Sequence, residues 1–433
     1  MGKRPKIDSS LLKGVVLRSN TTLLMSSVML FQFTGMLILA FKSETLDVQA
    51  LAKALALPAA TYLVMNIFSK IWPIDRALLL MTLFLCSISL VTLQDIAKSS
   101  VTPFNQAMYC LVGLFVMAAA IEFIRRLRAW EKWIIPACVI TFLLLAAPMV
   151  IGEEKYGAKN WIALWGDLSV QPSEFGKFLL ILILAAAFEG RPRFKKCLPP
   201  ILFAGMLCAL LLLEHDLGAL LIYYLTTVAL YYAATSNLIL TLSGLGLGGV
   251  GAVVAYKLFP YVAKRVEMFL NPWSDPLDKG WQIIQALIAI SSGGALGMGL
   301  GLGYPRNIPL YHSDFVFAAI SEEFGLIFSL GLLAVYVLIV MRGASIAMNA
   351  RTSFHALTAF GVVTLIALQT LIIVGGNIKL LPLTGVTLPL VSSGGSSMVS
   401  MMGCMGLLLG VSSINASDEA DDLIRMQWRE AQL

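Results

Sequence analysis

Long apolar runs, separated by short polar stretches, recur along almost the whole chain. Most hold roughly 17 to 25 residues, the length an α-helix needs to cross the hydrocarbon core of a bilayer. The pattern predicts twelve spans, near residues 21–41, 50–69, 77–94, 104–124, 133–151, 172–188, 198–213, 217–235, 238–259, 315–341, 354–374 and 388–412. The sequence therefore predicts an all-α integral membrane protein, a polytopic bundle of about twelve transmembrane helices. The polar break at Glu214 leaves open whether 198–235 is two spans or one irregular span.

Composition supports a membrane protein and excludes several function classes. Hydrophobic residues make up 58% of the 433 residues and charged residues 13%, and the mean hydropathy is +0.83. A soluble domain this apolar could not cover its surface with polar groups. The net charge of +6 comes from Lys and Arg in short loops rather than from one basic stripe, so nucleic acid is not an expected partner. The three histidines and six cysteines show no paired zinc-ligand spacing.

Charge in the loops predicts the orientation. With the N-terminus inside, 19 of the 31 Lys and Arg residues fall on the inner side and 9 on the outer side, as the positive-inside rule requires. We therefore expect a multi-pass protein of the cytoplasmic (inner) membrane, with one membrane domain at 21–412 and cytoplasmic tails at 1–20 and 413–433. Its long outer loop covers about 260–314. All the polar, Gly-rich or Pro-rich segments then lie outside, which argues against a cytosolic nucleotide as direct substrate.

The segment from Pro309 to Gly325 carries the strongest candidate chemistry. Asp314, two residues after His312, stands where the long outer loop enters a span. It is expected either to cap the helix or to act as a functional carboxylate. Glu322 and Glu323 lie roughly 12 Å further along the helix. Two acids at that depth must face a cavity or a cation, or form a structural ion pair.

Two shorter outer segments carry further charges. The first runs from Lys155 through Lys159 and Trp161 to Glu174 and Lys177. Glu174 and Lys177 are spaced i,i+3, so they are expected to pair, and a helix start explains most of this segment. The loop lysines could instead meet a phosphate. The second segment, around Asp216, is either a tight outer turn or a site for a cation or a pyrophosphate.

The remaining outer segments are rich in glycine, serine and proline. The long loop holds Arg265, an amphipathic stretch at 281–296 expected to lie on the membrane surface, and glycines from 293 to 303 that suggest a flexible lid. No strand–turn–helix context supports a dinucleotide site there. Irregular backbone at 375–397, with Lys379, Ser392 and Ser396, is tolerated near hydrocarbon only where it lines protein or a watery cavity.

These segments, in this order, resemble the SEDS family (shape, elongation, division and sporulation; the FtsW/RodA/SpoVE proteins). The motifs are GAKNW, QPSE, NPWSDP, SSGGALGMGLG, HSDFVFAAISEEFG and LPLTGVTLPLVSSGGSS, from Gly157 onward. Departures from the family pattern include Glu214 and His215 before Asp216, Phe324 in the EELG motif, and Ser393 in place of a tyrosine. The family has about ten spans, so two N-terminal spans are expected to be additional. The division, elongation and sporulation subgroups are not distinguished.

The resemblance implies a peptidoglycan glycosyltransferase that polymerises lipid II outside the cytoplasmic membrane, beside a class B penicillin-binding protein. The family's essential aspartate maps onto Asp314, which would act as general base. Cations or a divalent metal ion such as Mg²⁺ would stabilise the departing pyrophosphate. A lipid II flippase and a non-catalytic scaffold for the transpeptidase are the alternatives. The candidate substrate-binding residues are Lys155, Lys159, Trp161, Glu174, Lys177, Asp216, Arg265, His312, Glu322, Glu323, Lys379, Ser392 and Ser396.

Overall fold

The computed structural model describes residues 21–42, 48–96, 101–127, 129–155, 158–165, 168–190, 192–276 and 280–430. The predicted tail at 1–20 lies outside these residues. Within them, eleven helices are long and apolar enough to cross a membrane. They are α2 (Thr22–Lys42), α3 (Val48–Ile71), α4 (Arg76–Ile96), α5 (Val101–Arg126), α6 (Ile134–Ile151), α8 (Phe194–Leu213), α9 (Leu217–Thr235), α10 (Leu238–Leu258), α13 (Val316–Met348), α14 (Ser353–Asn377) and α15 (Gly395–Glu430). The predicted polytopic all-α membrane fold is confirmed.

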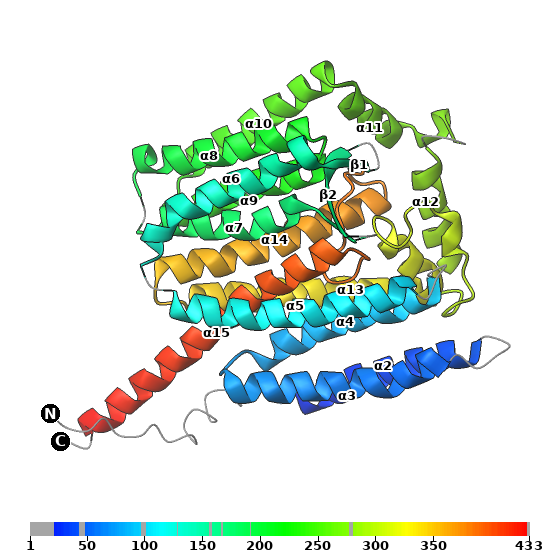
Figure 1. Cartoon of the computed structure of the whole chain (residues 1–433), viewed down its shortest axis with the longest axis horizontal. Helices are drawn as coiled ribbons and strands as arrows, with labels where there is room; N and C mark the ends of the chain where they lie inside the picture. The colour runs from blue at the N-terminus through cyan, green and yellow to red at the C-terminus, as the bar shows by residue number, and fades with distance from the viewer. Residues whose placement is uncertain are drawn as a thin grey trace.

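The twelfth predicted span, 172–188, corresponds to α7 (Pro172–Ala187). With 16 residues it is shorter than the eleven spanning helices. It nevertheless runs alongside them inside the bundle (Figure 1) and packs against α6, α9, α14 and α15. The neighbouring 198–235 region forms two helices, because the chain turns between α8 and α9 with His215 in the left-handed conformation.

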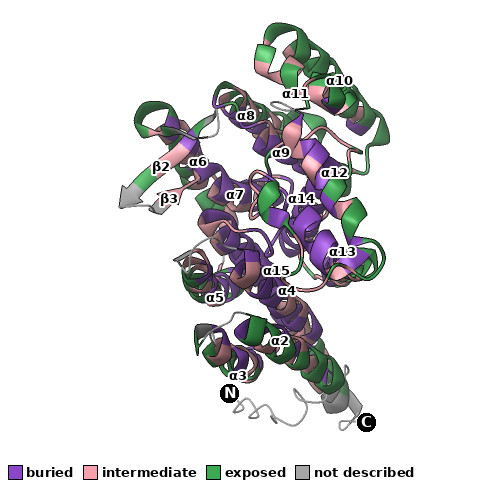
Figure 2. Ribbon diagram, turned by 90° about the vertical axis from the view of Figure 1, so that its right-hand side faces the viewer, coloured by how far each residue is buried: buried purple, intermediate pink, exposed green. Residues whose placement is uncertain are grey.

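The helices form one bundle with a polar end and a simpler end. The element β2, together with α11 (Pro260–Leu270) and α12 (Trp281–Gly293), lies at one end, whereas α2 begins and α15 ends at the other (Figure 1). Helices α4, α14 and α15 are the most buried, while α10 is exposed along the edge of the bundle (Figure 2). The short helices η1 (Trp130–Trp133), η2 (Pro272–Ser274) and η3 (Pro305–Asn307) lie in the connections.

A small antiparallel sheet interrupts the all-helical pattern. It contains β1 (Glu153–Lys155), β2 (Ala158–Trp165) and β3 (Leu168–Val170) in the order β1-β2-β3. Glu153 faces Trp161 across the first pair, and Ile162 faces Val170 across the second. The sequence does not predict these strands, since β1 and β3 have only three residues each and no long alternating pattern marks the segment.

Helix α13 is broken at Gly325, where φ is 81° and ψ is 175°. Beyond the break, Leu326 and Ile327 donate their backbone N–H groups to the carbonyls of Gly294 and Ala295 (2.9 and 3.1 Å). Before it, the carbonyls of Glu322 and Glu323 accept from Met298 and Gly299 (2.9 and 3.0 Å). The glycine-rich segment 293–303 is therefore hydrogen-bonded to both halves of the broken helix, and its interpretation as a flexible lid stays a prediction.

The last helix differs from its predicted bounds at both ends. Residues 388–394 are not helical, and α15 begins at Gly395 and continues to Glu430. The predicted cytoplasmic tail from residue 413 is thus largely the continuation of the span as one helix. This part of α15 extends beyond the other helices (Figure 1). Arg351 forms ion pairs with Asp418 and Asp422 where this extension begins.

Candidate active site

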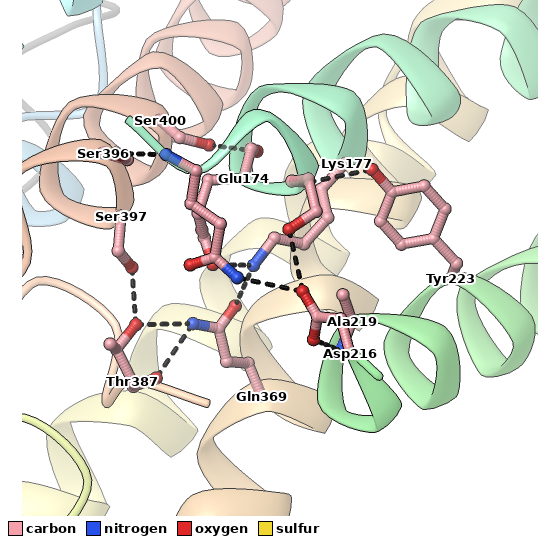
Figure 3. A network of polar contacts seen from close by, with 12 residues as sticks. Glu174, Lys177, Asp216, Ala219, Tyr223, Gln369, Thr387, Ser396, Ser397 and Ser400 are labelled. Atoms are coloured by element: carbon pink, nitrogen blue, oxygen red, sulfur yellow. Dashed lines mark hydrogen bonds and ion pairs between the residues drawn. The ribbon is translucent and has the colours of Figure 1, made fainter. Parts of the chain in front are cut away.

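Asp216 is the centre of a buried hydrogen-bond network at the polar end of the bundle (Figure 3). It is the N-cap of α9, and its Oδ1 accepts from the backbone of Ala219 at 3.0 Å. Its Oδ2 accepts from Asn160 Nδ2 (3.0 Å), Gln171 Nε2 (2.9 Å) and Ser173 Oγ (3.1 Å). This candidate substrate-binding residue therefore ties the sheet, the start of α7 and the start of α9 together.

The predicted Glu174–Lys177 pair is confirmed and fully buried. Lys177 Nζ lies 2.7 Å from Glu174 Oε1, and the two side chains are 1% and 8% exposed. Lys177 also donates to Gln369 Oε1 at 3.4 Å, and Gln369 Nε2 donates to the Thr387 carbonyl at 2.8 Å (Figure 3). Glu174 Oε2 is buried without a hydrogen-bond partner among the described residues. The pair links α7 to α14 and to the loop that follows it.

The loop at 378–394 is hydrogen-bonded to the segment that carries Asp314. Ser392 Oγ donates to the Ser313 carbonyl at 2.6 Å and accepts from the Leu388 backbone at 2.8 Å. The Ser393 N–H donates to the His312 carbonyl at 2.8 Å. Further along, Ser396 Oγ accepts from the Gln171 backbone at 3.0 Å. Ser392 and Ser396 thus hold backbone on either side of the site.

Asp314 is not a helix cap. The N-cap of α13 is Phe315, which has no side-chain capping hydrogen bond. Instead, Asn377 reaches across from α14: its Oδ1 accepts from the Ala318 N–H at 3.2 Å, and its Nδ2 donates to the Asp314 carbonyl at 2.8 Å. The Asp314 carboxylate, partly exposed, faces Gly385, where an added Cβ would lie 3.7 Å from Oδ2. The interpretation of Asp314 as a helix cap is therefore wrong, and its role as a functional carboxylate stays a prediction.

Arg265, from α11, lies within the electrostatic range of two carboxylates. Burial lowers the pKa of Arg265 below its usual value, while the charges of Asp216 and Asp314 both act to raise it. Arg265 also donates to the Leu383 carbonyl at 3.4 Å. Burial raises the pKa of Asp314 from 3.8 to about 6, although a hydrogen bond from Ser313 and the charge of Arg265 both act to lower it. At pH 7 the carboxylate is mostly ionised and still basic enough to accept a proton.

Two other titratable groups lie close to these charges. Burial, reinforced by the negative charge of Asp216, raises the pKa of Glu214 to about 8. Its Oε1 is buried without a partner among the described residues. Burial also lowers the pKa of His312, so its ring is neutral at pH 7. The site therefore combines the ionised carboxylate of Asp314 and the negative charge of Asp216 with the protonated carboxyl of Glu214 and the Arg265 cation.

Several predicted residues lie elsewhere. Lys159 donates to the Met149 carbonyl at 3.0 Å and so completes the end of α6. Lys379 reaches the Leu270 carbonyl at the end of α11 at 3.4 Å. Glu322 and Glu323 lie against the glycine-rich segment, and Glu322 Oε1 accepts from the Tyr304 backbone at 3.1 Å. Lys155 lies in β1, its side chain being outside the described part of the structure, and Trp161 is half-buried in β2.

Sequence reasoning missed two residues that organise the site. Gln369 and Asn377 are buried polar residues of α14, and each joins two elements through its amide. The available signal was that a polar residue inside an apolar span is expensive unless it bonds internally. Within the described residues, no group of three or more His, Cys, Asp or Glu side chains could hold a metal ion. The carboxylates present do not by themselves form a site for Mg²⁺.

A family model matches this framework. The FtsW/RodA/SpoVE model, described as a cell cycle protein, matches residues 68–417. The chain belongs to this family. The match begins at the end of α3, so α2 and most of α3 precede it, in agreement with two additional N-terminal spans.

Individual relatives come from each branch of the family. The peptidoglycan glycosyltransferase RodA of Mycobacterium tuberculosis (strain ATCC 25618 / H37Rv) is 34% identical over 71% of this chain and 70% of its own length. A probable peptidoglycan glycosyltransferase FtsW of Geobacter sp. (strain M18) is 35% identical over 71% and 86%. Stage V sporulation protein E of Bacillus subtilis (strain 168) is 34% identical over 66% and 79%.

Solved structures of the family share the fold. A chain from a structure on the coordination of polymerization and crosslinking by a peptidoglycan synthase complex superposes with a TM-score of 0.68. It is 30% identical and covers 79% of this chain and 98% of its own. The rod shape determining protein RodA of Thermus thermophilus superposes with a TM-score of 0.60 at 27% identity, over 78% and 96%. The family core is therefore present almost in full.

Proposed function

We propose that this protein is a peptidoglycan glycosyltransferase that polymerises lipid II, with Asp314 as its general base. One observation carries the proposal: Asn377 caps α13, so the Asp314 carboxylate is not used as a cap, and it lies within the electrostatic range of Arg265. The family membership and the relatives named as peptidoglycan glycosyltransferases support the same activity. Asp314 lies at the end of the bundle where the outer loops meet.

The reaction needs a base, an electrostatic clamp and a substrate that stays in the membrane. The acceptor sugar hydroxyl attacks the anomeric carbon of the donor, and the C–O bond to the lipid pyrophosphate breaks with inversion. Asp314 takes the hydroxyl proton, and the pyrophosphate leaves with the bonding electron pair. Arg265 is the side chain best placed to stabilise the charge that develops on the pyrophosphate. No step requires a metal ion whose ligands all come from the protein.

The setting follows from the same evidence. We place the site on the outer side of the cytoplasmic membrane and both chain ends on the cytoplasmic side. The excess of Lys and Arg on the predicted inner side supports this orientation, as does the start of α2 at the end of the bundle where α15 terminates (Figure 1). A class B penicillin-binding protein is the proposed partner, since a matched structure comes from a synthase complex that joins polymerization and crosslinking.

The test uses purified full-length protein and lipid II in detergent or vesicles, with and without the transpeptidase. The wild type is expected to make glycan strands, and Asp314→Asn to make none. Glu267→Gln is the matched control, because it removes an exposed carboxylate from the same helix as Arg265. Activity retained in Asp314→Asn removes the residue from this role. Movement of labelled lipid II across vesicles without any glycan product indicates a flippase instead.

A further inference from the structure

The two N-terminal helices that precede most of the family match are joined to the core by specific polar contacts. Gln32 of α2 is 1% exposed, and its Nε2 donates both to Thr61 Oγ1 of α3 (2.7 Å) and to Ser87 Oγ of α4 (2.6 Å). Gly35 lets α2 approach Val91 of α4, where an added Cβ would lie only 3.1 Å from a methyl group. The hairpin stands beside α4 as a separate layer (Figures 1 and 2).

The hairpin also covers the break in α13. Phe31 of α2 stacks on Phe328 (ring centroids 5.9 Å apart) and contacts Phe324 (6.5 Å), one on each side of Gly325. Leu300 of the glycine-rich segment and Phe324 both pack on a hydrophobic cluster formed by α2, α3 and α4. The break therefore lies under the hairpin.

Lys42, in the last turn of α2, reaches the charged groups beside the break. Its Nζ lies 2.6 Å from Asp95 Oδ1, and the Asp95 side chain is only 4% exposed. An added Cβ at Gly301 would lie 2.2 Å from the same Nζ, so Lys42 lies directly on the glycine-rich backbone. The Glu323 carboxyl lies beside Asp95 and within the electrostatic range of Lys42.

Three carboxyl groups gather beside the break. Asp95, Glu322 and Glu323 act on one another, and the carboxyl of Glu323 interacts directly with the side chain of Asp95. Arg306 contacts the backbone carbonyls of Ile96 (3.2 Å) and Asp95 (3.5 Å). Lys42 forms a direct ion pair with Asp95 here, and it comes from outside the matched family core.

We infer that the α2–α3 hairpin is a brace, and that Lys42 is a positioning residue for Asp314. The ion pair with Asp95 holds residues 297–301 against the break, and the backbone of 294–299 in turn holds both halves of α13. The outer half, Val316–Phe324, follows Asp314 directly, so its angle sets where the carboxylate stands. Displacing a catalytic group by about 1 Å can slow a reaction about 100-fold. This inference rests on the proposed function.

The test compares Lys42→Met with Lys42→Arg, with Lys42→Met/Asp95→Asn, and with Lys70→Met in the full-length protein. Lys70 is an exposed lysine at the other end of the same hairpin, so its replacement matches the loss of charge. Lys42→Met is expected to lower kcat for lipid II polymerisation about 10-fold, with KM near wild type. Lys42→Arg is expected to recover most of kcat by restoring the ion pair. The double variant is expected to stay as slow as Lys42→Met, because it still lacks the ion pair although no uncompensated Asp95 charge remains. Recovery in the double variant would show that the uncompensated charge, and not the loss of the ion pair, slows the reaction.

Hydrogen exchange supplies a readout that does not depend on activity. Lys42→Met is expected to speed exchange of the Met298, Gly299, Leu326 and Ile327 amides about 10-fold, and Lys70→Met to leave it unchanged. Unchanged exchange in Lys42→Met, or an equal change in Lys70→Met, overturns the brace. A kcat loss that Lys42→Arg does not restore overturns the ion pair as its cause. If the wild type makes no glycan, the proposed function fails, and the exchange measurement still decides on the brace.

Discussion

Asp314→Asn should abolish polymerisation while making the protein more stable at neutral pH. The substitution keeps the size of the side chain and removes its charge. The wild-type carboxylate is desolvated, and its pKa is raised from 3.8 to about 6. The folded state therefore disfavours the ionised form that catalysis needs, and the asparagine relieves this penalty. Loss of activity with gain of stability distinguishes a functional carboxylate from a structural one.

The magnitude follows from linkage. A rise in pKa from 3.8 to about 6 corresponds to about 3 kcal/mol against the ionised folded state. The pKa of Asp314 in the folded state lies above its value in the unfolded state. The protonated carboxyl therefore contributes its full stability to the wild-type fold below about pH 4. This stability is lost as the pH rises through about 6. Partial exposure of the carboxylate reduces the effect. We therefore expect the free energy of unfolding of Asp314→Asn to exceed that of the wild type by about 1–3 kcal/mol at pH 8 and by little near pH 4.

The assay measures thermal unfolding of both proteins in the same detergent between pH 4 and pH 8, beside the rate of lipid II polymerisation. The wild-type rate should fall as the pH drops through about 6, because Asp314 must be ionised to accept a proton. A stability difference that does not change with pH refutes the electrostatic argument. A wild-type rate that is flat between pH 5 and pH 7 refutes the assignment of Asp314 as the base.

Three further predictions concern the network, the break and the metal. Lys177→Met leaves Glu174 buried without its cation and should destabilise the protein by about 3–5 kcal/mol, and Lys177→Met/Glu174→Gln should recover most of the loss of Tm. Gly297→Ala should lower stability by about 1–3 kcal/mol, because φ is +86° and a Cβ would lie 2.2 Å from the Glu323 carbonyl oxygen, whereas Gly246→Ala in open space should not. EDTA should raise KM for lipid II without changing Tm, since any divalent cation would be held mainly by the pyrophosphate; a fall in Tm would indicate a metal site within the protein.

The spans could be predicted because the bilayer fixes both their length and their composition. The same reasoning distinguished the end of the bundle that carries the polar loops from the end with short connections. The i,i+3 spacing predicted the pairing of Glu174 with Lys177. These features depend on neighbours in sequence. The division between α8 and α9, left open by the sequence, was decided by the turn at His215.

The features that the sequence did not reveal depend on distant partners. The run through Gly325 reads as one apolar helix, and the groups that satisfy its break lie some 30 residues earlier in the chain, at Gly294–Gly299. The sequence was equally compatible with Asp314 as the cap of α13. The side chain that caps this helix instead, Asn377, comes from another helix. Hydropathy and spacing carry no information on such pairings.

The break at Gly325 also bears on how the protein enters the membrane. The part of α13 beyond the break, Leu326–Met348, contains 23 residues and is by itself long enough to cross the hydrocarbon core. The translocon can thus release an ordinary apolar segment into lipid, without ever burying Glu322 and Glu323 in its path.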